Sequence, residues 1–186
     1  MHKYIWIFII GVILWFASCK KPVNFSDNQS LKVAFSNDTI TFDTVFTTLG
    51  SSTRHLMVYN NSDENLKISS IRLQNGNQSQ FAINVDGEAG YDFSDIEIYA
   101  KDSIYIFIKV TINPNDQNSP FFVEEKLLFE TNGNKQEVSL TAFGQNANYI
   151  VADQYIKGYP KFKMVADSLQ ETHWTSERPY VIYGYA

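Results

Sequence analysis

The sequence is poor in the residues that cross-link or catalyse. It holds one cysteine in 186 residues, so no disulfide within the chain can stabilise it and an apolar core must do so. Apart from His2, the histidines are His55 and His173, and neither has a thiol or a second histidine nearby with which to form a triad or a zinc site. We therefore predict that the chain is not an enzyme and has no catalytic residue, metal site or cofactor.

Other features are missing too. There is no glycine-rich phosphate loop, and the formal net charge of −5 argues against a nucleic-acid partner, whose phosphates require a basic surface. The longest apolar run, Tyr4–Phe16, has about 13 residues, whereas a membrane-spanning helix needs ~20.

The N-terminus instead has the layout of a cleaved secretion signal. A short polar start with Lys3 precedes the apolar run, and small residues follow it. Phe16-Ala17-Ser18-Cys19 resembles a lipobox, with Phe in place of the more usual Leu. We predict a signal peptide over 1–18 and lipidation of Cys19. An uncleaved anchor and plain secretion are the alternatives.

Residues 19–30 are polar and unpatterned, and we expect them to form a lipidated tether. The acyl chains would supply the two hydrophobic anchors that stable membrane attachment takes. The expected location is the bacterial cell envelope, on the outer membrane. Lys20 and Lys21, in place of acidic residues after the cysteine, favour its periplasmic face.

Residues 31–147 show the two-residue periodicity of half-buried strands, clearest over Ile104–Ile112. Asn132-Gly133 is a strong hairpin signal. Short strands with turns every 8–12 residues predict an all-β fold, an immunoglobulin-like antiparallel β-sandwich. The Cys-Trp-Cys pattern of antibody domains is missing, and periodicity alone leaves a barrel open.

Two strands carry more detailed predictions. In the first, Ile40, Phe42, Thr44 and Phe46 are expected on one face and Val45 on the other. In 66–73 the alternation slips after Ile68, which predicts a β-bulge.

Residues 148–186 are rich in tyrosine and differ from the preceding segment. A short helix could lie within 154–170, where Gly158 and Pro160 would interrupt it. Tyr180–Tyr183 reads as a strand with no partner after it. We expect this tail to be the start of a following β domain, and the chain to be the front of a longer protein.

The strand motifs resemble a family of Bacteroidetes lipoproteins. The resemblance rests on segments 42–51, 58–61, 67–71, 81–87, 100–107 and 131–134. It implies an immunoglobulin-like module of the abnormal-spindle and major-sperm-protein type. In longer family members, a segment like Trp174–Ala186 leads into a right-handed parallel β-helix.

Four sites also resemble the Asp-Ser/Thr-apolar acceptor of Bacteroidetes O-glycosylation. The candidate acceptors are Thr39, Thr44, Ser103 and Ser168. Such dipeptides commonly begin strands, which is the alternative explanation.

Oxygen-rich clusters give weaker signals. Asp92, Asp95 and Glu97, and the pair Glu124 and Glu125, are expected on solvated faces. The loop over 113–118 offers oxygen atoms for calcium without the spacing of a known site.

The predicted function is a non-catalytic stalk or interaction module, held on the membrane by its lipid anchor. Its partner would be a protein or a glycan, because aromatic side chains on a sheet face can contact either. The main alternative is the N-terminal leader of a longer β-helix protein that acts on polysaccharide. A subunit of an outer-membrane nutrient-uptake system is a third hypothesis.

Overall fold

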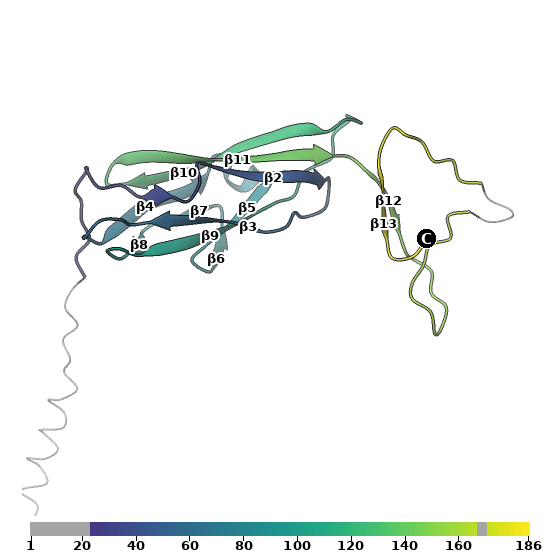
Figure 1. Ribbon diagram of the computed structural model, residues 1–186, viewed down its shortest axis with the longest axis horizontal. Coiled ribbons are helices and arrows are strands. Elements are labelled where there is room, and N and C mark those ends of the chain that lie inside the picture. The colour runs from purple at the N-terminus through teal and green to yellow at the C-terminus, as the bar shows by residue number, and fades with distance from the viewer. Residues whose placement is uncertain (1–22, 167–170) are drawn as a thin grey trace, which may run out of the picture.

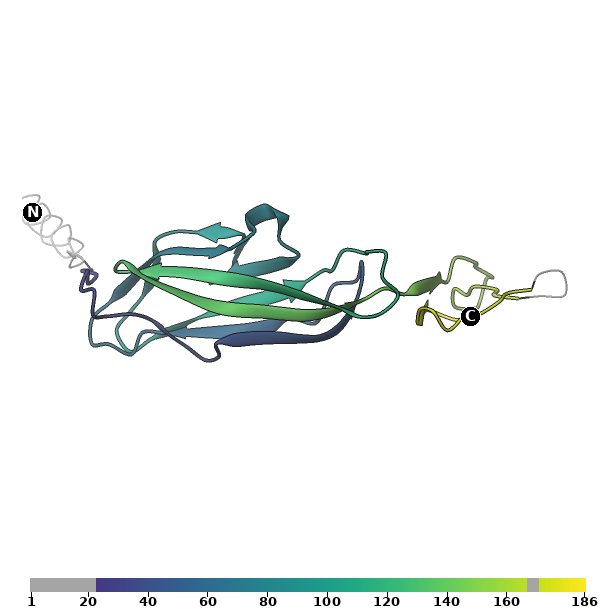
Figure 2. The same cartoon turned by 90° about the horizontal axis from the view of Figure 1, so that it is seen from above.

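The computed structural model describes residues 23–166 and 171–186. The predicted signal peptide 1–18, Cys19 and Ser168 lie outside these residues. Two β-sheets face each other, and a small third sheet lies beyond one end of them (Figures 1 and 2). The strands are β1 (Ala34–Phe35), β2 (Thr39–Phe46), β3 (Arg54–Tyr59), β4 (Leu66–Leu73), β5 (Phe81–Val85), β6 (Glu88–Gly90), β7 (Asp92–Phe93), β8 (Ile96–Ile98), β9 (Ser103–Val110), β10 (Phe121–Thr131), β11 (Asn134–Gln145), β12 (Asn148–Val151) and β13 (Tyr180–Tyr183).

The strand order is that of an immunoglobulin-like sandwich. The first sheet runs β1-β3-β9-β5-β6 and the second runs β2-β11-β10-β4-β7, with β8 also paired to β4. If β1 and β2 are taken as two parts of the first strand, and β6 and β7 are left out, these orders are A-B-E-D and A′-G-F-C, an immunoglobulin-like arrangement in which the first strand is shared between the two sheets. Within these two sheets every pair is antiparallel except β2 with β11, which is parallel. The predicted fold class is confirmed.

Alternating side chains of both sheets form a single apolar core. Along β9, Ile104, Ile106 and Ile108 point inward, and their neighbours point outward. Phe42 of the second sheet meets Phe81 of the first, with ring centroids 6.0 Å apart. This core takes the place of the disulfide that the sequence lacks.

The prediction for one face of β2 was wrong, because the strand contains a bulge. Thr141 pairs with Thr41 and Phe143 pairs with Thr44, so β2 has one residue more than β11 over this stretch. The extra residue reverses the alternation, and Val45 rather than Thr44 enters the core.

The bulge predicted in β4 is confirmed. Glu130 pairs with Ser70 and Thr131 with Ile68, which leaves Ser69 without a partner in the register. The predicted hairpin is also present, since Asn132 and Gly133 have φ angles of 51° and 77°.

The described part of the expected tether is held against the sandwich. The side chain of Asn132 donates to the carbonyl of Asn28 over 3.0 Å, and that of Asn134 donates to Gln29 over 2.9 Å. The Asn65 side chain donates to the carbonyl of Asn24 over 3.0 Å. From Asn24 onward, therefore, the chain is docked on the end of the sandwich that carries the β10–β11 hairpin.

In its described residues, the tail contains the predicted strand but not the short helix considered there. No helix forms in its described residues, 148–166 and 171–186; instead Gln154 and Phe162 form an antiparallel bridge. The strand over Tyr180–Tyr183 is present, but its partner, β12, precedes it and the pair is parallel. Among the described residues of the whole chain, no helix is long and apolar enough to cross a membrane.

Candidate functional site

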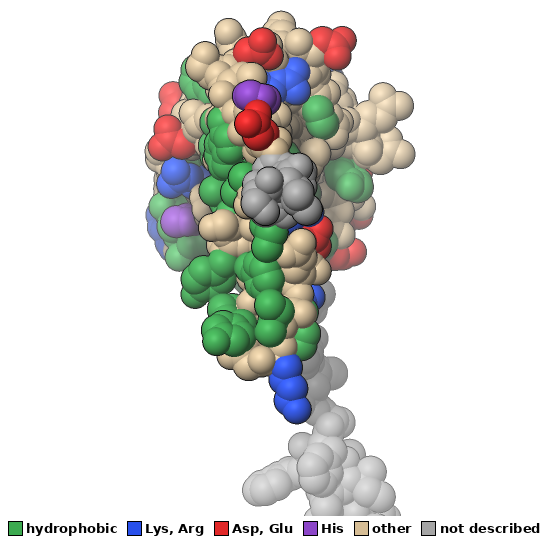
Figure 3. All heavy atoms as spheres, turned by 90° about the vertical axis from the view of Figure 1, so that its right-hand side faces the viewer, with side chains coloured by type: hydrophobic (Ala, Val, Ile, Leu, Met, Phe, Trp, Pro, Cys, Tyr) green, Lys and Arg blue, Asp and Glu red, His purple; other side chains and the backbone are tan. Residues whose placement is uncertain are grey.

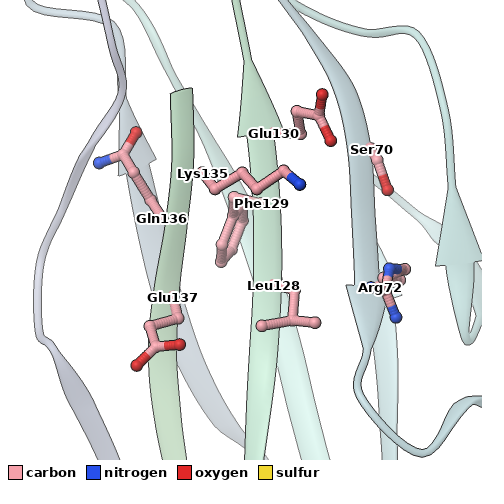
Figure 4. A pocket seen from close by; sticks show the side chains of 8 residues that line it. All are labelled: Ser70, Arg72, Leu128, Phe129, Glu130, Lys135, Gln136 and Glu137. Carbon is pink, nitrogen blue, oxygen red and sulfur yellow. The ribbon is translucent and has the colours of Figure 1, made fainter. Parts of the chain in front are cut away.

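The two outer faces of the sandwich differ in chemistry. On the six-stranded sheet, charges of both signs alternate, and Lys126 pairs with Glu137 while Lys67 lies 3.7 Å from Glu97. A groove of about 310 Å³ crosses β11, β10 and β4 on this face. Figure 4 shows Lys135 extending across β10 in this groove, with Glu130 and Arg72 beyond it. This mixture is typical of a solvated face.

Each outer face carries an exposed aromatic pair, Phe122 with Phe143 on the six-stranded sheet and Tyr105 with Phe107 on the five-stranded sheet. Tyr105 and Phe107 project from β9 with 47% and 45% of their surface exposed. Their rings lie nearly parallel, 12° apart, with centroids separated by 6.1 Å. The ring of His55 on β3 lies 6.1 Å from that of Tyr105. We define His55, Tyr105 and Phe107 as the aromatic face.

Strand register explains this arrangement. Along β9 every second residue enters the core, so Tyr105 and Phe107 must point outward. Phe107 pairs with His55 on one side and with Asn84 on the other, which brings the rings of two strands together. In the sequence, Tyr105 and Phe107 stand between the inward-facing isoleucines of 104–108, so the two-residue periodicity that predicted the strand also implied that both rings point outward.

Apart from Lys109, the strand neighbours of the aromatic face are uncharged. The register of the sheet places these residues on the same outer side: Ala34, Met57, Tyr59, Ala82, Asn84, Ala89, Ser103 and Lys109. Among these strand positions and the aromatic face itself there is no aspartate or glutamate. Asp86, in the turn after β5, is next to Tyr105, whose carbonyl accepts a hydrogen bond from the backbone N–H of Asp86 over 3.3 Å. The direct cross-strand neighbours of the rings are Met57 beside Tyr105, and His55 and Asn84 beside Phe107.

The candidate glycosylation sites do not come together. Thr39 and Thr44 are exposed on β2, while Ser103 is half-buried at the start of β9 in the other sheet. The backbone N–H of Ser103 donates to the carboxylate of Asp102 over 2.7 Å, so this Asp-Ser pair stabilises the beginning of a strand. Ser168 lies outside the described residues.

The acidic and histidine side chains considered as candidates form no catalytic or metal-binding group in the described residues. Glu125 was expected on a solvated face, and this was wrong: it is 5% exposed and its carboxylate is hydrogen-bonded to the loop before β5. His173 is exposed and lies 3.7 Å from Glu171. Within residues 23–166 and 171–186, no three His, Cys, Asp or Glu side chains are grouped so as to hold a metal ion.

The loop considered for calcium uses its oxygen atoms internally. The buried side-chain amide of Asn146 donates to the carbonyl and the side-chain oxygen of Asn115, each over 2.8 Å. The carbonyl of Asn118 accepts from the side chain of Gln145 over 3.0 Å. The loop is thus fastened to the end of β11, where the tail begins.

The tail presents an apolar surface at this end of the molecule, seen as a band of hydrophobic side chains in Figure 3. An apolar hollow of about 290 Å³ lies between Ile156, Tyr159 and Tyr185, with Pro160 and Phe162. In the strands β12 and β13, no residue is fully buried. Parallel strands are normally covered on both faces.

Comparison with known proteins gives neither a family nor a curated relative. No protein-family model matches the sequence. No curated protein matches it either.

Several solved structures share a similar arrangement of strands. A PapD-like domain of human CEP192 is 14% identical with a TM-score of 0.39, over 70% of this chain and 94% of that domain. A Porphyromonas gingivalis protein of unknown function is 15% identical with a TM-score of 0.42, over 69% of this chain and 61% of that one. A family 123 glycoside hydrolase from Clostridium perfringens is 8% identical with a TM-score of 0.43, over 64% of this chain and 30% of the enzyme.

The chain therefore spans less than two thirds of the last two proteins. Its own strand order defines the class, which is an immunoglobulin-like β-sandwich module.

Proposed function

We propose that the protein is a lipid-anchored module of the bacterial cell envelope, a non-catalytic stalk that binds a protein or glycan partner. The observation that carries this proposal is the path of the chain: it enters the sandwich at one end and leaves at the opposite end (Figure 1). A module with this path would hold its exit end at a fixed distance from the membrane anchor at its entry end.

Both ends are fastened, as a spacer requires. At the entry end, Asn132 and Asn134 hold the segment 28–31. At the exit end, the hydroxyl of Tyr149 donates to the carbonyl of Thr47, which ties β12 to the end of β2. Fixed ends transmit orientation as well as distance, whereas a flexible linker transmits distance only.

The anchor is tested in the native organism with Cys19→Ala. Lipidated protein should sediment with membranes, and its intact mass should exceed that of the cleaved polypeptide by the acyl chains. Cys19→Ala should lack this extra mass and leave the membrane fraction. Wild-type protein that carries no acyl chains would contradict the proposal. A matched Ser18→Ala variant, which keeps a small residue before the cysteine, should behave as wild type.

A second function is favoured by one observation in the tail. Strands β12 and β13 pair in parallel, Asn148 opposite Tyr180, across a connection of irregular chain. Parallel pairing of successive strands through a loop is how a β-helix is built, which agrees with a leader of a longer polysaccharide-active protein. The same mass measurement separates the two: a mass well above that of the lipidated chain favours the leader.

A further inference from the structure

We infer that a polar hollow between the sandwich and the tail binds a neutral glycan, through hydrogen bonds to its hydroxyls and the packing of a sugar ring on Trp174. This inference rests on the proposed function and narrows its partner to one chemical class. The hollow has a volume of about 600 Å³ and lies between the loop over 113–118 and the segment 175–180. It is thus at the exit end of the sandwich, where β12 and β13 begin (Figure 1).

Both walls of the hollow are held in place. The Nε of Arg178 donates to the side-chain oxygen of Asn118, which joins the tail to the loop. The hydroxyl of Tyr180 accepts from the backbone N–H of Thr175 over 3.1 Å, which closes this part of the tail into a turn. The loop itself is fastened to the end of β11. Walls that are fixed in advance lose little conformational entropy when a ligand binds between them.

The side chains of the hollow require a ligand whose groups both donate and accept hydrogen bonds. The carboxylates of Asp116 and Glu177 only accept, so a ligand that covers them must supply donors. The guanidinium of Arg178 only donates, so the same ligand must supply acceptors. A hydroxyl does both, and a sugar carries several on neighbouring carbons. An apolar ligand would take these charges out of water without replacing their hydrogen bonds, at a large energetic cost.

The balance of charge disfavours ionic ligands. Among the described residues, neither Asp116 nor Glu177 is in an ion pair, so both carboxylates can face a ligand. These two carboxylates repel an acidic polymer, and Arg178 repels a cationic one. The centre of a protein interface is normally poor in charged side chains, unlike this hollow. The lining therefore favours a glycan that carries no charge.

An aromatic pair beside the hollow supplies the apolar contact for a sugar ring. Tyr180 lines the hollow, and the ring of Trp174 lies against that of Tyr180 with centroids 4.3 Å apart. Trp174 keeps 47% of its surface exposed. The C–H groups of a pyranose pack on the face of an indole, which carries negative partial charge. Hydrogen bonds in the hollow and packing on the indole would then act on the same stretch of glycan.

The experiment is affinity electrophoresis of the full-length protein in gels containing galactomannan, arabinoxylan, laminarin or dextran, with polygalacturonate as the acidic comparison. We expect at least one neutral polymer to retard the protein and polygalacturonate not to do so. Added salt should change the retardation little, because no ion pair forms with a neutral ligand. Asp116→Asn and Trp174→Ala should each weaken the binding about tenfold, through loss of a charge-assisted hydrogen bond and of a ring contact.

Two substitutions outside the hollow are matched controls. Asp63 is exposed in the loop after β3, and Tyr155 is exposed elsewhere in the tail, so Asp63→Asn and Tyr155→Ala should leave retardation unchanged. Circular dichroism of each variant would confirm that it is folded. Asp116 is exposed, so Asp116→Asn keeps the test decisive even where Trp174→Ala disturbs the tail.

Retardation by none of the neutral polymers, stronger retardation by polygalacturonate, or an equal loss in the control variants would overturn the inference. If no polymer retards the protein and Asp116→Asn instead loses a protein captured from envelope extracts, the hollow is a protein-binding site. None of these results affects the membrane-anchoring test, so the two proposals fail separately.

Discussion

Glu125 accepts a hydrogen bond from the hydroxyl of Ser79 over 2.6 Å, although 46 positions separate the two residues in the chain. Ser79 precedes β5 in the first sheet and Glu125 lies on β10 in the second, so the bond joins the sheets at their border. The second carboxylate oxygen accepts from the backbone N–H of Asn75 over 2.9 Å. One buried carboxylate thus holds the whole loop over 75–79.

Replacing Glu125 by Ala should destabilise the fold by about 1–3 kcal/mol, because the N–H of Asn75 and the hydroxyl of Ser79 lose their acceptor. Glu124 is exposed on the adjacent position of β10 and provides the control. Urea unfolding followed by circular dichroism of the β-sheets would measure both variants. An equal effect of Glu124→Ala would show that the carboxylate of Glu125 has no special role.

A second buried polar side chain, Asn60, holds the opposite end of the sandwich. Its side-chain N–H groups donate to the carbonyls of Glu64, Ile98 and Tyr99 over 2.8, 3.1 and 3.0 Å. Its side-chain oxygen accepts from the backbone N–H and the hydroxyl of Ser62 over 3.0 and 2.7 Å. Asn60 therefore joins the loop after β3 to the loop before β9.

Asn60→Ala should cost roughly 2–4 kcal/mol in the free energy of unfolding, since several carbonyls would be left without donors in a buried site. Thermal and urea unfolding would measure the change. Its neighbour Asn61 is exposed, so Asn61→Ala should stay within about 0.5 kcal/mol of wild type. The prediction fails if the two substitutions have similar effects.

The sequence was sufficient to predict features set by local periodicity or turn chemistry. Alternating isoleucines in 104–108 defined β9, and Asn132-Gly133 defined a hairpin, because both signals lie within a few residues. The slip after Ile68 also showed the bulge in β4, since a bulge displaces the apolar residues on its own strand.

Features that depend on distant partners could not be predicted. The burial of Glu125 is explained by the loop over 75–79, which lies next to it only in the folded chain. The parallel pairing of β12 with β13 joins segments about 30 residues apart, which no local pattern records. The bulge in β2 followed from its register with β11, and without that register Thr44 had seemed a core position.

Gly144 on β11 allows close packing at the exit end of the sandwich. A Cβ at this position would lie 2.6 Å from the ring of Phe121 and 2.8 Å from a methyl group of Ile112. Ile112 is fully buried and cannot move aside without disturbing the core.

Gly144→Ala should therefore destabilise the protein by about 1–3 kcal/mol through overpacking. At Gly50 the nearest atom to an added Cβ is 3.8 Å away, in ordinary contact, so Gly50→Ala should have little effect on stability. Thermal unfolding of the two variants would compare them directly. A Gly144→Ala protein as stable as wild type would show that Phe121 and Ile112 can adjust.

The tail contains an ion pair whose effect on pKa can be measured. The antiparallel bridge between Gln154 and Phe162 brings Asp153 and Lys163 side by side, and the Lys163 ammonium donates to the Asp153 carboxylate over 2.6 Å. This hydrogen bond, assisted by the attraction of the charges, lowers the pKa of Asp153 below its ordinary value of 3.8 and outweighs the opposing effect of desolvation.

Because the pKa of Asp153 is lower in the folded chain, the contribution of the pair is complete above the ordinary pKa and is lost as the pH falls through the lowered pKa. Lys163→Met should return the pKa of Asp153 toward its ordinary value, as measured by the carboxyl ¹³C shift during an acid titration. Lys161 is exposed on the same segment, and Lys161→Met should leave the titration of Asp153 nearly unchanged. If both substitutions shifted it equally, the cause would be the general charge of the tail, and the bridge would not be what positions the pair.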